Sequence, residues 1–179
     1  NFKKFVDFLK SKNHFLDEPE RHRIQIYPFH VTLYKQTKNG YLYVNEATKT
    51  VIATNYPDYR VGRKTYGRVI YTNSLILHES LSRNREDLIT KFANWGHNTD
   101  VNIEVFMKKW DTVNETNYKT MSGFFFLEPS VWERLDFIEG DHIDAVFENF
   151  RNQKEKQMYK SKFYLVKKNL GQFFKFAFK

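Results

Sequence analysis

Apolar and polar positions alternate along several segments of the chain, and this alternation predicts a protein rich in β-strands. Residues 24–33 alternate with an interruption at Pro28, and residues 41–44 form a return strand after a turn at residues 38–40. The spacing of apolar side chains at the start of the chain predicts a short amphipathic helix over residues 1–12. The other predicted strands are residues 50–54, 68–77, 88–95, 101–105 and 124–127.

The last third of the chain combines a helical pattern with a second hairpin. A long helix is predicted within residues 130–150, where Gly140 would kink it. Residues 163–178 are predicted to be a hairpin that turns at residues 169–171. The predicted fold class is α+β: a twisted antiparallel β-sheet with a short N-terminal helix and a long helix after the fourth strand of a ββββα unit.

The length of the chain suits one domain with its own hydrophobic core, so residues 1–179 are predicted to be a single domain. Within it, residues 1–60 would be an N-terminal extension of a helix and a hairpin. Residues 66–150 would be the ββββα unit, and residues 151–179 a basic C-terminal hairpin or tail.

Composition excludes some classes of site. The chain has no Cys, which excludes disulfides and cysteine metal sites, and its six His show no metal-ligand spacing, so neither a metal nor a cofactor is expected. With no long apolar run, the protein is expected to be cytoplasmic, or nuclear in a eukaryote. The 18 Phe and 11 Tyr are typical of an AT-rich source such as a phage, plasmid or virus.

Charge is unevenly distributed along the chain. Residues 151–179 hold nine Lys and Arg and one acid, so the net charge of this segment, +8, equals that of the whole chain. Residues 21–68 have a net charge of +7. Residues 128–150 hold seven acids and a single Arg. Two basic segments therefore flank one acidic segment, and the basic segments suit a phosphate backbone.

Three clusters mix basic and aromatic side chains, the combination that holds the phosphates and bases of a single strand. The first lies in residues 60–71, the second in residues 108–110 and the third in residues 118–119. The predicted nucleic-acid-binding residues are Arg60, Arg63, Lys64, Tyr66, Arg68, Tyr71, Lys108, Lys109, Trp110, Tyr118 and Lys119. No catalytic residue is predicted.

A family resemblance accompanies this pattern over residues 66–150. The chain reads Lys-Phe-Ala-Asn-Trp-Gly at 91–96, Asp-Val-Asn-Ile at 100–103 and Lys-Thr-Met-Ser-Gly at 119–123. Trp-Glu-Arg-Leu follows at 132–135. These motifs resemble the positive cofactor four family of transcription coactivators, and the extra N-terminal strands resemble the larger Whirly-type proteins.

The resemblance implies binding of single-stranded DNA on a curved, basic antiparallel sheet, and a homodimer through the helix at 130–150. From the residues and the resemblance together, we expect a protein that binds single-stranded nucleic acid, DNA more than RNA. Such a protein would act in replication, recombination or transcription.

Two other functions remain open from the sequence. The acidic segment could be the contact surface of a protein-interaction module, for instance an inhibitor of a host enzyme, with the basic tail steering the encounter. Alternatively, His30-Val31-Thr32 matches the His-x-Thr strand of two-histidine phosphoesterases, with His97 or His78 in the second motif.

Overall fold

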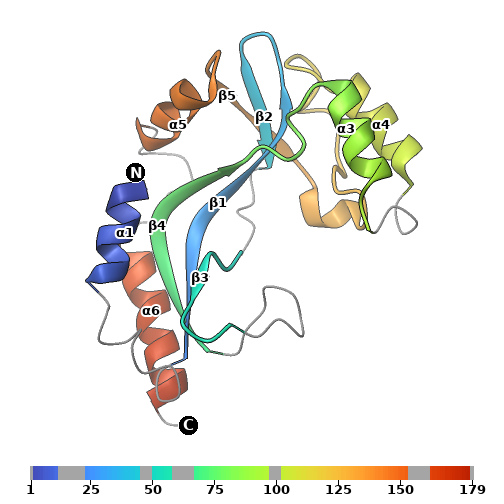
Figure 1. Cartoon of the computed structure of the whole chain (residues 1–179). Helices are drawn as coiled ribbons and strands as arrows, with labels where there is room; N and C mark the ends of the chain where they lie inside the picture. The colour runs from blue at the N-terminus through green and yellow to red at the C-terminus, as the bar shows by residue number, and fades with distance from the viewer. Residues whose placement is uncertain are drawn as a thin grey trace. The chain divides into compact units, whose positions relative to one another are not determined.

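The computed structural model describes residues 2–11, 23–44, 50–57, 67–96, 102–152 and 162–177. In these ranges an antiparallel five-stranded sheet is combined with helices at the start, middle and end of the chain (Figure 1). The strands are β1 (Ile24–Gln36), β2 (Gly40–Val44), β3 (Ala53–Thr54), β4 (Arg68–His78) and β5 (Leu135–Glu139). The helices are α1 (Phe2–Lys10), α3 (Arg85–Ala93), α4 (Ile103–Thr112), η3 (Pro129–Trp132), α5 (Ile143–Asn152) and α6 (Lys162–Ala177). The α+β class, the antiparallel sheet and the short N-terminal helix are confirmed.

The chain forms two compact units that interleave along the sequence. Unit 1 comprises Asn1–His30, Lys49–Ile76 and Tyr159–Lys179, and unit 2 comprises Val31–Thr48 and Leu77–Met158. Strands β1 and β4 each begin in unit 1 and end in unit 2. Both ends of the chain therefore belong to the same unit, although the whole of unit 2 lies between them in sequence.

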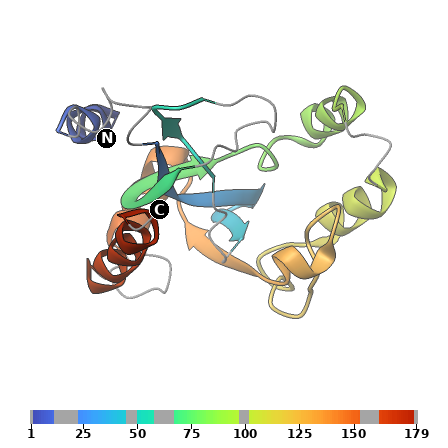
Figure 2. The ribbon, with the colours of Figure 1, turned by 90° about the horizontal axis from the view of Figure 1, so that it is seen from below.

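Unit 1 is built on the first half of β1. This half pairs antiparallel with β3, with Gln25 opposite Thr54 and Ile26 opposite Ala53, and β4 pairs with β1 as well. The hydroxyl of Thr72 on β4 donates to the carbonyl oxygen of Tyr27 on β1 at 3.3 Å. Helix α6 lies beside β4, as the view from below also shows (Figure 2).

Unit 2 is built on the hairpin of β1 and β2, and the predicted turn at residues 38–40 is confirmed. The amide of Thr37 donates to the carbonyl oxygen of Gly40 at 2.8 Å, which closes the turn. Strand β2 then pairs antiparallel with β5, with Gly40 opposite Glu139. A Cβ atom at Gly40 would lie 2.1 Å from the carbonyl oxygen of Ile138, so this close approach of two strands requires glycine.

The hydrophobic core of unit 2 lies between this hairpin and the helices α3 and α4. Its side chains come from strands, helices and the irregular segment before η3, and burying them stabilises the unit by about 25 cal/mol per Å² of apolar surface. The buried members are Tyr34, Leu42, Val44, Leu81, Leu88, Phe92, Phe106, Met107, Trp110, Val113, Tyr118, Phe124, Trp132 and Leu135.

Two predicted strands are wrong, because residues 88–95 and 101–105 lie largely in helices α3 and α4. Each helix begins at an asparagine cap. The side chain of Asn84 accepts from the amide of Asp87 at 2.8 Å, and that of Asn102 accepts from the amide of Val105 at 3.0 Å. The run of four strands expected between residues 66 and 150 therefore consists of β4 and β5 with two helices between them.

The next two predictions are also corrected by the structure. Residues 124–127 form no regular strand, although the amide of Phe124 donates to the carbonyl oxygen of Trp132 at 2.7 Å. The long helix predicted at 130–150 is divided into η3, β5 and α5. Gly140, between β5 and α5, has a φ of 146°, which a continuous helix cannot contain. The residues before it form β5 instead, because they pair with β2.

Three smaller corrections concern the remaining strands. Residues 163–178 are predicted as a hairpin, but residues 163–177 lie in helix α6, which continues through Gly171, and residue 178 is outside the described residues. Strand β1 runs through Pro28 without interruption. Within the predicted strand 50–54, only Ala53–Thr54 are paired as β3.

Candidate nucleic-acid interface

The first predicted cluster lies in unit 1, and two of its residues can be described. Arg60, Arg63, Lys64 and Tyr66 lie outside the described residues, whereas Arg68 and Tyr71 are on β4. The guanidinium of Arg68 lies over the ring of Phe173 on α6, 5.1 Å from its centroid. The Nε atom of Arg68 is buried and has no hydrogen-bond partner among the described residues.

Tyrosine rings lie on the strands of unit 1. Tyr71 packs edge-on against Tyr27 of β1 with 5.7 Å between ring centroids. Burial, and secondarily the neighbouring Tyr71 hydroxyl, raises the pKa of Tyr27 above its ordinary value. A second cation–ring pair is close by in the same unit, since Arg23 lies 3.8 Å from the centroid of Tyr56. In both pairs a guanidinium covers one face of a ring, and cations beside aromatic rings are the side-chain types that bind single-stranded nucleic acids.

The edge of β4 is covered by amide side chains of α6. The Asn169 side chain accepts from the amide of Tyr71 at 2.9 Å and donates to the carbonyl oxygen of Tyr71 at 3.1 Å. The Gln172 side chain accepts from the amide of Val69 at 3.4 Å. The side chains of Asn169 and Gln172 thus make hydrogen bonds that a further strand would otherwise make at this edge. These bonds also hold α6 on β4, the strand that carries Arg68.

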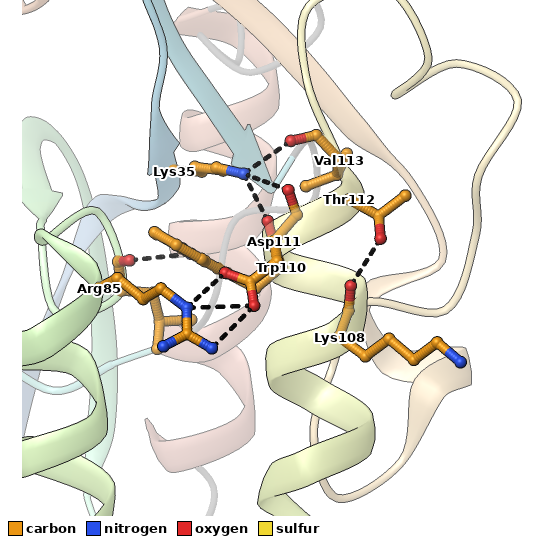
Figure 3. A network of polar contacts seen from close by, with 8 residues as sticks. Lys35, Arg85, Lys108, Trp110, Asp111, Thr112 and Val113 are labelled. Atoms are coloured by element: carbon orange, nitrogen blue, oxygen red, sulfur yellow. Dashed lines mark hydrogen bonds and ion pairs between the residues drawn. The ribbon is translucent and has the colours of Figure 1, made fainter.

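The second predicted cluster lies on α4 in unit 2, and its three residues have different environments. Lys108 is exposed and its ammonium group points away from the polar network drawn in Figure 3. The Nζ atom of Lys109 instead donates to the carbonyl oxygens of Ser122, at 2.8 Å, and Gly123. Lys109 therefore joins α4 to a loop rather than extending into solvent.

Trp110, predicted to stack on bases, is a core residue. Its side chain is only 6% exposed, and its Nε1 donates to the carbonyl oxygens of Tyr34 at 3.0 Å and Leu81 at 3.2 Å. The ring therefore presents no accessible face in this structure. A buried indole with both a packed ring and a satisfied N–H stabilises the unit instead.

The end of α4 is capped by a lysine that the prediction did not include. The Nζ atom of Lys35 donates to the carbonyl oxygens of Trp110 at 2.5 Å, Asp111 at 3.1 Å and Val113 at 2.9 Å (Figure 3). Burial lowers the pKa of Lys35, and the nearby Asp111 carboxylate partly opposes this shift. Asp111 in turn accepts from the guanidinium of Arg85 at 3.0 Å.

The third predicted cluster lies beside an acidic hollow of unit 2. Tyr118 is 9% exposed, and the exposed Lys119 lies 5.7 Å from the centroid of its ring. Both residues line an open hollow of about 500 Å³ together with Asp136, Phe137, Glu139, Asn149 and Asn152. The two carboxylates make this hollow a poor place for phosphate, because like charges repel.

The structure thus separates the predicted binding residues into units of opposite charge. Unit 1 contains 17 Lys and Arg and 5 Asp and Glu, a net charge of +12, and includes the whole first cluster. Unit 2 contains 12 Lys and Arg and 16 Asp and Glu, a net charge of −4, and includes the second and third clusters. Neither net charge can be read from the order of charged residues along the sequence, because unit 1 consists of three separate segments.

Sequence reasoning missed the helical character of α6. Residues 159–179 contain six Lys and no acid, and the prediction treated them as part of a basic hairpin or tail. Phe163, Val166, Leu170 and Phe174 recur at i, i+3, i+7 and i+11, which is the signal that could have identified the helix. The aromatic and β-branched composition of the segment favoured strand instead.

The histidines of the phosphoesterase alternative are placed only in part. His30 lies on β1 in unit 1 and is 7% exposed, whereas His78 ends β4 in unit 2 and is exposed. His97 lies outside the described residues.

Across the described ranges, no group of three or more His, Asp and Glu side chains is placed to hold a metal ion. No helix in the described part of the chain is long and apolar enough to cross a membrane. Comparisons with protein-family models, curated proteins and solved structures found no match to this chain.

Proposed function

We propose that this protein binds single-stranded nucleic acid and that unit 1 is its binding surface. The observation that carries the proposal is the net charge of +12 gathered in this one unit. Each phosphate that a Lys or Arg neutralises releases a counterion, and this release drives the binding of nucleic acid by basic surfaces. A protein of this kind would act in replication, recombination or transcription.

Aromatic side chains support single-stranded rather than duplex substrates. Arg68 with Phe173, and Arg23 with Tyr56, bring a guanidinium and a ring together in unit 1. A base stacked on a ring contributes roughly 1–3 kcal/mol, and a duplex hides the base faces that such stacking needs. DNA is the expected substrate, in line with the resemblance described above.

The predicted residues Arg60, Arg63 and Lys64 give the sharpest test, because they are not among the residues named above in the α6–β4 contacts. We expect R60Q/R63Q/K64Q to weaken affinity for a labelled single-stranded oligonucleotide in anisotropy titrations. The plot of log affinity against log salt concentration should flatten by about 0.7 for each phosphate that the variant no longer neutralises. A matched control, K38Q/K108Q/K119Q, removes three exposed cations from unit 2 and should retain most of the affinity.

Two outcomes would contradict this assignment. If the unit 2 variant loses as much affinity as the unit 1 variant, the second and third clusters contact phosphate and unit 1 is not the sole surface. If the unsubstituted protein binds duplex DNA as tightly as single-stranded DNA, base stacking plays no part in its function.

Unit 2 favours a second function, contact with a basic protein partner. Its net charge is −4, and Asp136 and Glu139 line the hollow beside Tyr118 and Phe137. Rings next to carboxylates suit the guanidinium or ammonium groups of a partner. Isothermal titration with a polyarginine peptide would test this function, and D136N/E139Q should reduce the heat of binding.

A further inference from the structure

Helix α6 exposes several large apolar side chains. Phe163 is 78% exposed, Val166 55%, Leu170 50% and Phe174 56%, and we refer to these four residues as the α6 stripe. At 100° per residue they lie within about 80° of one another around the helix axis. They form a single apolar face that none of the described hydrogen bonds to β4 involves.

The rest of α6 carries lysines and no acid, together with further apolar side chains, since Tyr164 is 38% exposed, Phe173 46% and Phe176 37%. Lys167, Lys168 and Lys175 lie on this helix, which contains no acidic residue. By helical spacing, Lys167 flanks the α6 stripe, and the other two lysines lie on the side opposite to it. Asn169 and Gln172 occupy the side that contacts β4. An apolar face combined with lysines and without acids is typical of helices that lie in the plane of a membrane surface.

We propose that α6 binds the surface of an anionic phospholipid bilayer, with the α6 stripe inserted among the lipids. The lysines attract the anionic headgroups, and the Phe, Val and Leu side chains leave water for the acyl boundary. No described helix can span a bilayer, so this is attachment to one surface. The inference goes beyond nucleic-acid binding, since it concerns the α6 stripe and a different ligand.

The chemistry of the α6 stripe argues against the two other occupants. Val166 and Leu170 offer no ring on which a base could stack, so half of the stripe would be of little use to nucleic acid. In a second copy of the chain, an opposing α6 would cover the apolar side chains but contains no acidic residue to pair with Lys167 at the edge of the stripe. An anionic surface satisfies both the apolar face and the charge.

Sedimentation with lipid vesicles tests the proposal. We expect the protein to sediment with vesicles of phosphatidylcholine and phosphatidylserine in equal parts, and much less with phosphatidylcholine alone. F163Q/V166Q/L170Q should reduce the partition coefficient on the order of a hundredfold, because three apolar side chains no longer leave water. K167Q/K168Q/K175Q should reduce it by roughly fivefold per lysine.

A matched control removes exposed apolar side chains from unit 2. Val105 is 60% exposed, Leu127 52% and Val131 41%, so V105Q/L127Q/V131Q replaces the same number of exposed apolar side chains without touching α6. This variant should sediment with anionic vesicles as the unsubstituted protein does. Circular dichroism of each variant should match that of the unsubstituted protein, since every substituted side chain is exposed.

An optical measurement reports the insertion directly. Phe163→Trp adds an indole to the α6 stripe, and its emission, taken as a difference from the unsubstituted protein, should shift to shorter wavelength when anionic vesicles are added. An unshifted emission, or equal sedimentation of the stripe variant and the unsubstituted protein, would overturn the proposal. So would a concentration-dependent dimer in sedimentation velocity that F163Q/V166Q/L170Q abolishes, because the α6 stripe would then contact a second copy.

The two proposals fail in different ways. F163Q/V166Q/L170Q keeps every charge, so its affinity for single-stranded DNA should be unchanged while its lipid binding disappears. R60Q/R63Q/K64Q should show the reverse, with weaker affinity for DNA and an intact α6 stripe. Lipid binding without DNA binding contradicts only the proposed function, and DNA binding without lipid binding contradicts only this inference.

Discussion

Asn169 on α6 bonds both backbone groups of Tyr71 on β4, accepting from its amide at 2.9 Å and donating to its carbonyl oxygen at 3.1 Å. One primary amide thus satisfies a donor and an acceptor of the same residue, as a paired strand would. The two residues are 98 positions apart in sequence, so this bond pair attaches the C-terminal helix to the sheet of unit 1.

Asn169→Ala should therefore destabilise the protein by about 1–3 kcal/mol, because Tyr71 would lose both partners in a partly buried position. Helix propensity acts in the opposite direction, since Ala is a better helix former than Asn. Urea denaturation measures the change, and hydrogen exchange at the Tyr71 amide should become faster. Lys168→Ala, at the exposed neighbouring position, is the control and should stay within about 0.5 kcal/mol. Equal effects at the two positions would show that Asn169 does not hold α6 on β4.

Lys108 and Lys109 are adjacent on α4 but should respond differently to substitution. Lys109→Met removes the hydrogen bonds to the carbonyl oxygens of Ser122 and Gly123, and we expect a decrease of about 1–3 kcal/mol in the free energy of unfolding. Lys108→Met removes an exposed side chain and should change it by less than about 0.5 kcal/mol. If Lys109→Met weakened DNA binding and left stability unchanged, the phosphate contact predicted from the sequence would be correct.

Glu115 should make the stability of unit 2 depend on pH. Hydrogen bonds from the Thr37 side chain, and then from the backbone and side chain of Asn39, hold the pKa of this carboxyl below its ordinary value of 4.5. A carboxyl whose pKa is lower in the folded state contributes stability above its ordinary pKa. That contribution is lost as the pH falls through the folded-state value.

The comparison to make is between the unsubstituted protein and Glu115→Gln, which has no ionisable group at this position. The difference in the free energy of unfolding should be largest near neutral pH and should shrink as the pH is lowered below 4.5. The backbone amide of Asn39 donates to one carboxylate oxygen of Glu115 at 2.9 Å, and its side-chain amide donates to the other at 2.8 Å. The turn at residues 38–40 should therefore be the region that is destabilised. A difference that stayed constant with pH would contradict the shift.

The apolar residues expected to form a dimer are largely covered within one chain. Trp132, Leu135, Ile138, Val146 and Phe150 are at most 7% exposed. Within residues 130–150, Val131 is 41% exposed and Ile143 and Phe147 are partly buried, so these three apolar side chains are left for a two-fold contact. Sedimentation equilibrium at micromolar concentration should give a mass of 21.7 kDa that does not change with concentration. A mass that rises with concentration would require a different contact surface.

Local patterns in the sequence were sufficient for elements that contact their neighbours in sequence. The amphipathic spacing of residues 1–12 predicted α1, and the turn at residues 38–40 predicted the hairpin of β1 and β2. In both cases the side-chain period and the turn residues act over a few positions, so the sequence alone contains the information. The basic character of the C-terminal segment was likewise visible from its composition.

Local patterns failed where a short segment suited two structures. Val101, Ile103 and Val105 alternate as in a strand, yet the cap at Asn102 and the buried side chains of Phe106, Met107 and Trp110 make residues 103–112 a helix. Burying those three side chains outweighs a few positions of alternation. The sequence also does not show which face of α4 is covered. For that reason Lys109 and Trp110 were predicted to contact nucleic acid, although both make contacts within unit 2.

What the sequence alone determined is the α+β class, the hairpin and the presence of basic and acidic segments. Only the tertiary structure decided which basic segments belong together, because the three parts of unit 1 are separated by unit 2 along the chain. The bonds between Asn169 and Tyr71, rather than local propensity, place the acid-free helix α6 beside Arg68. Charge acts through distance in space, so its effect depends on contacts that no local pattern encodes.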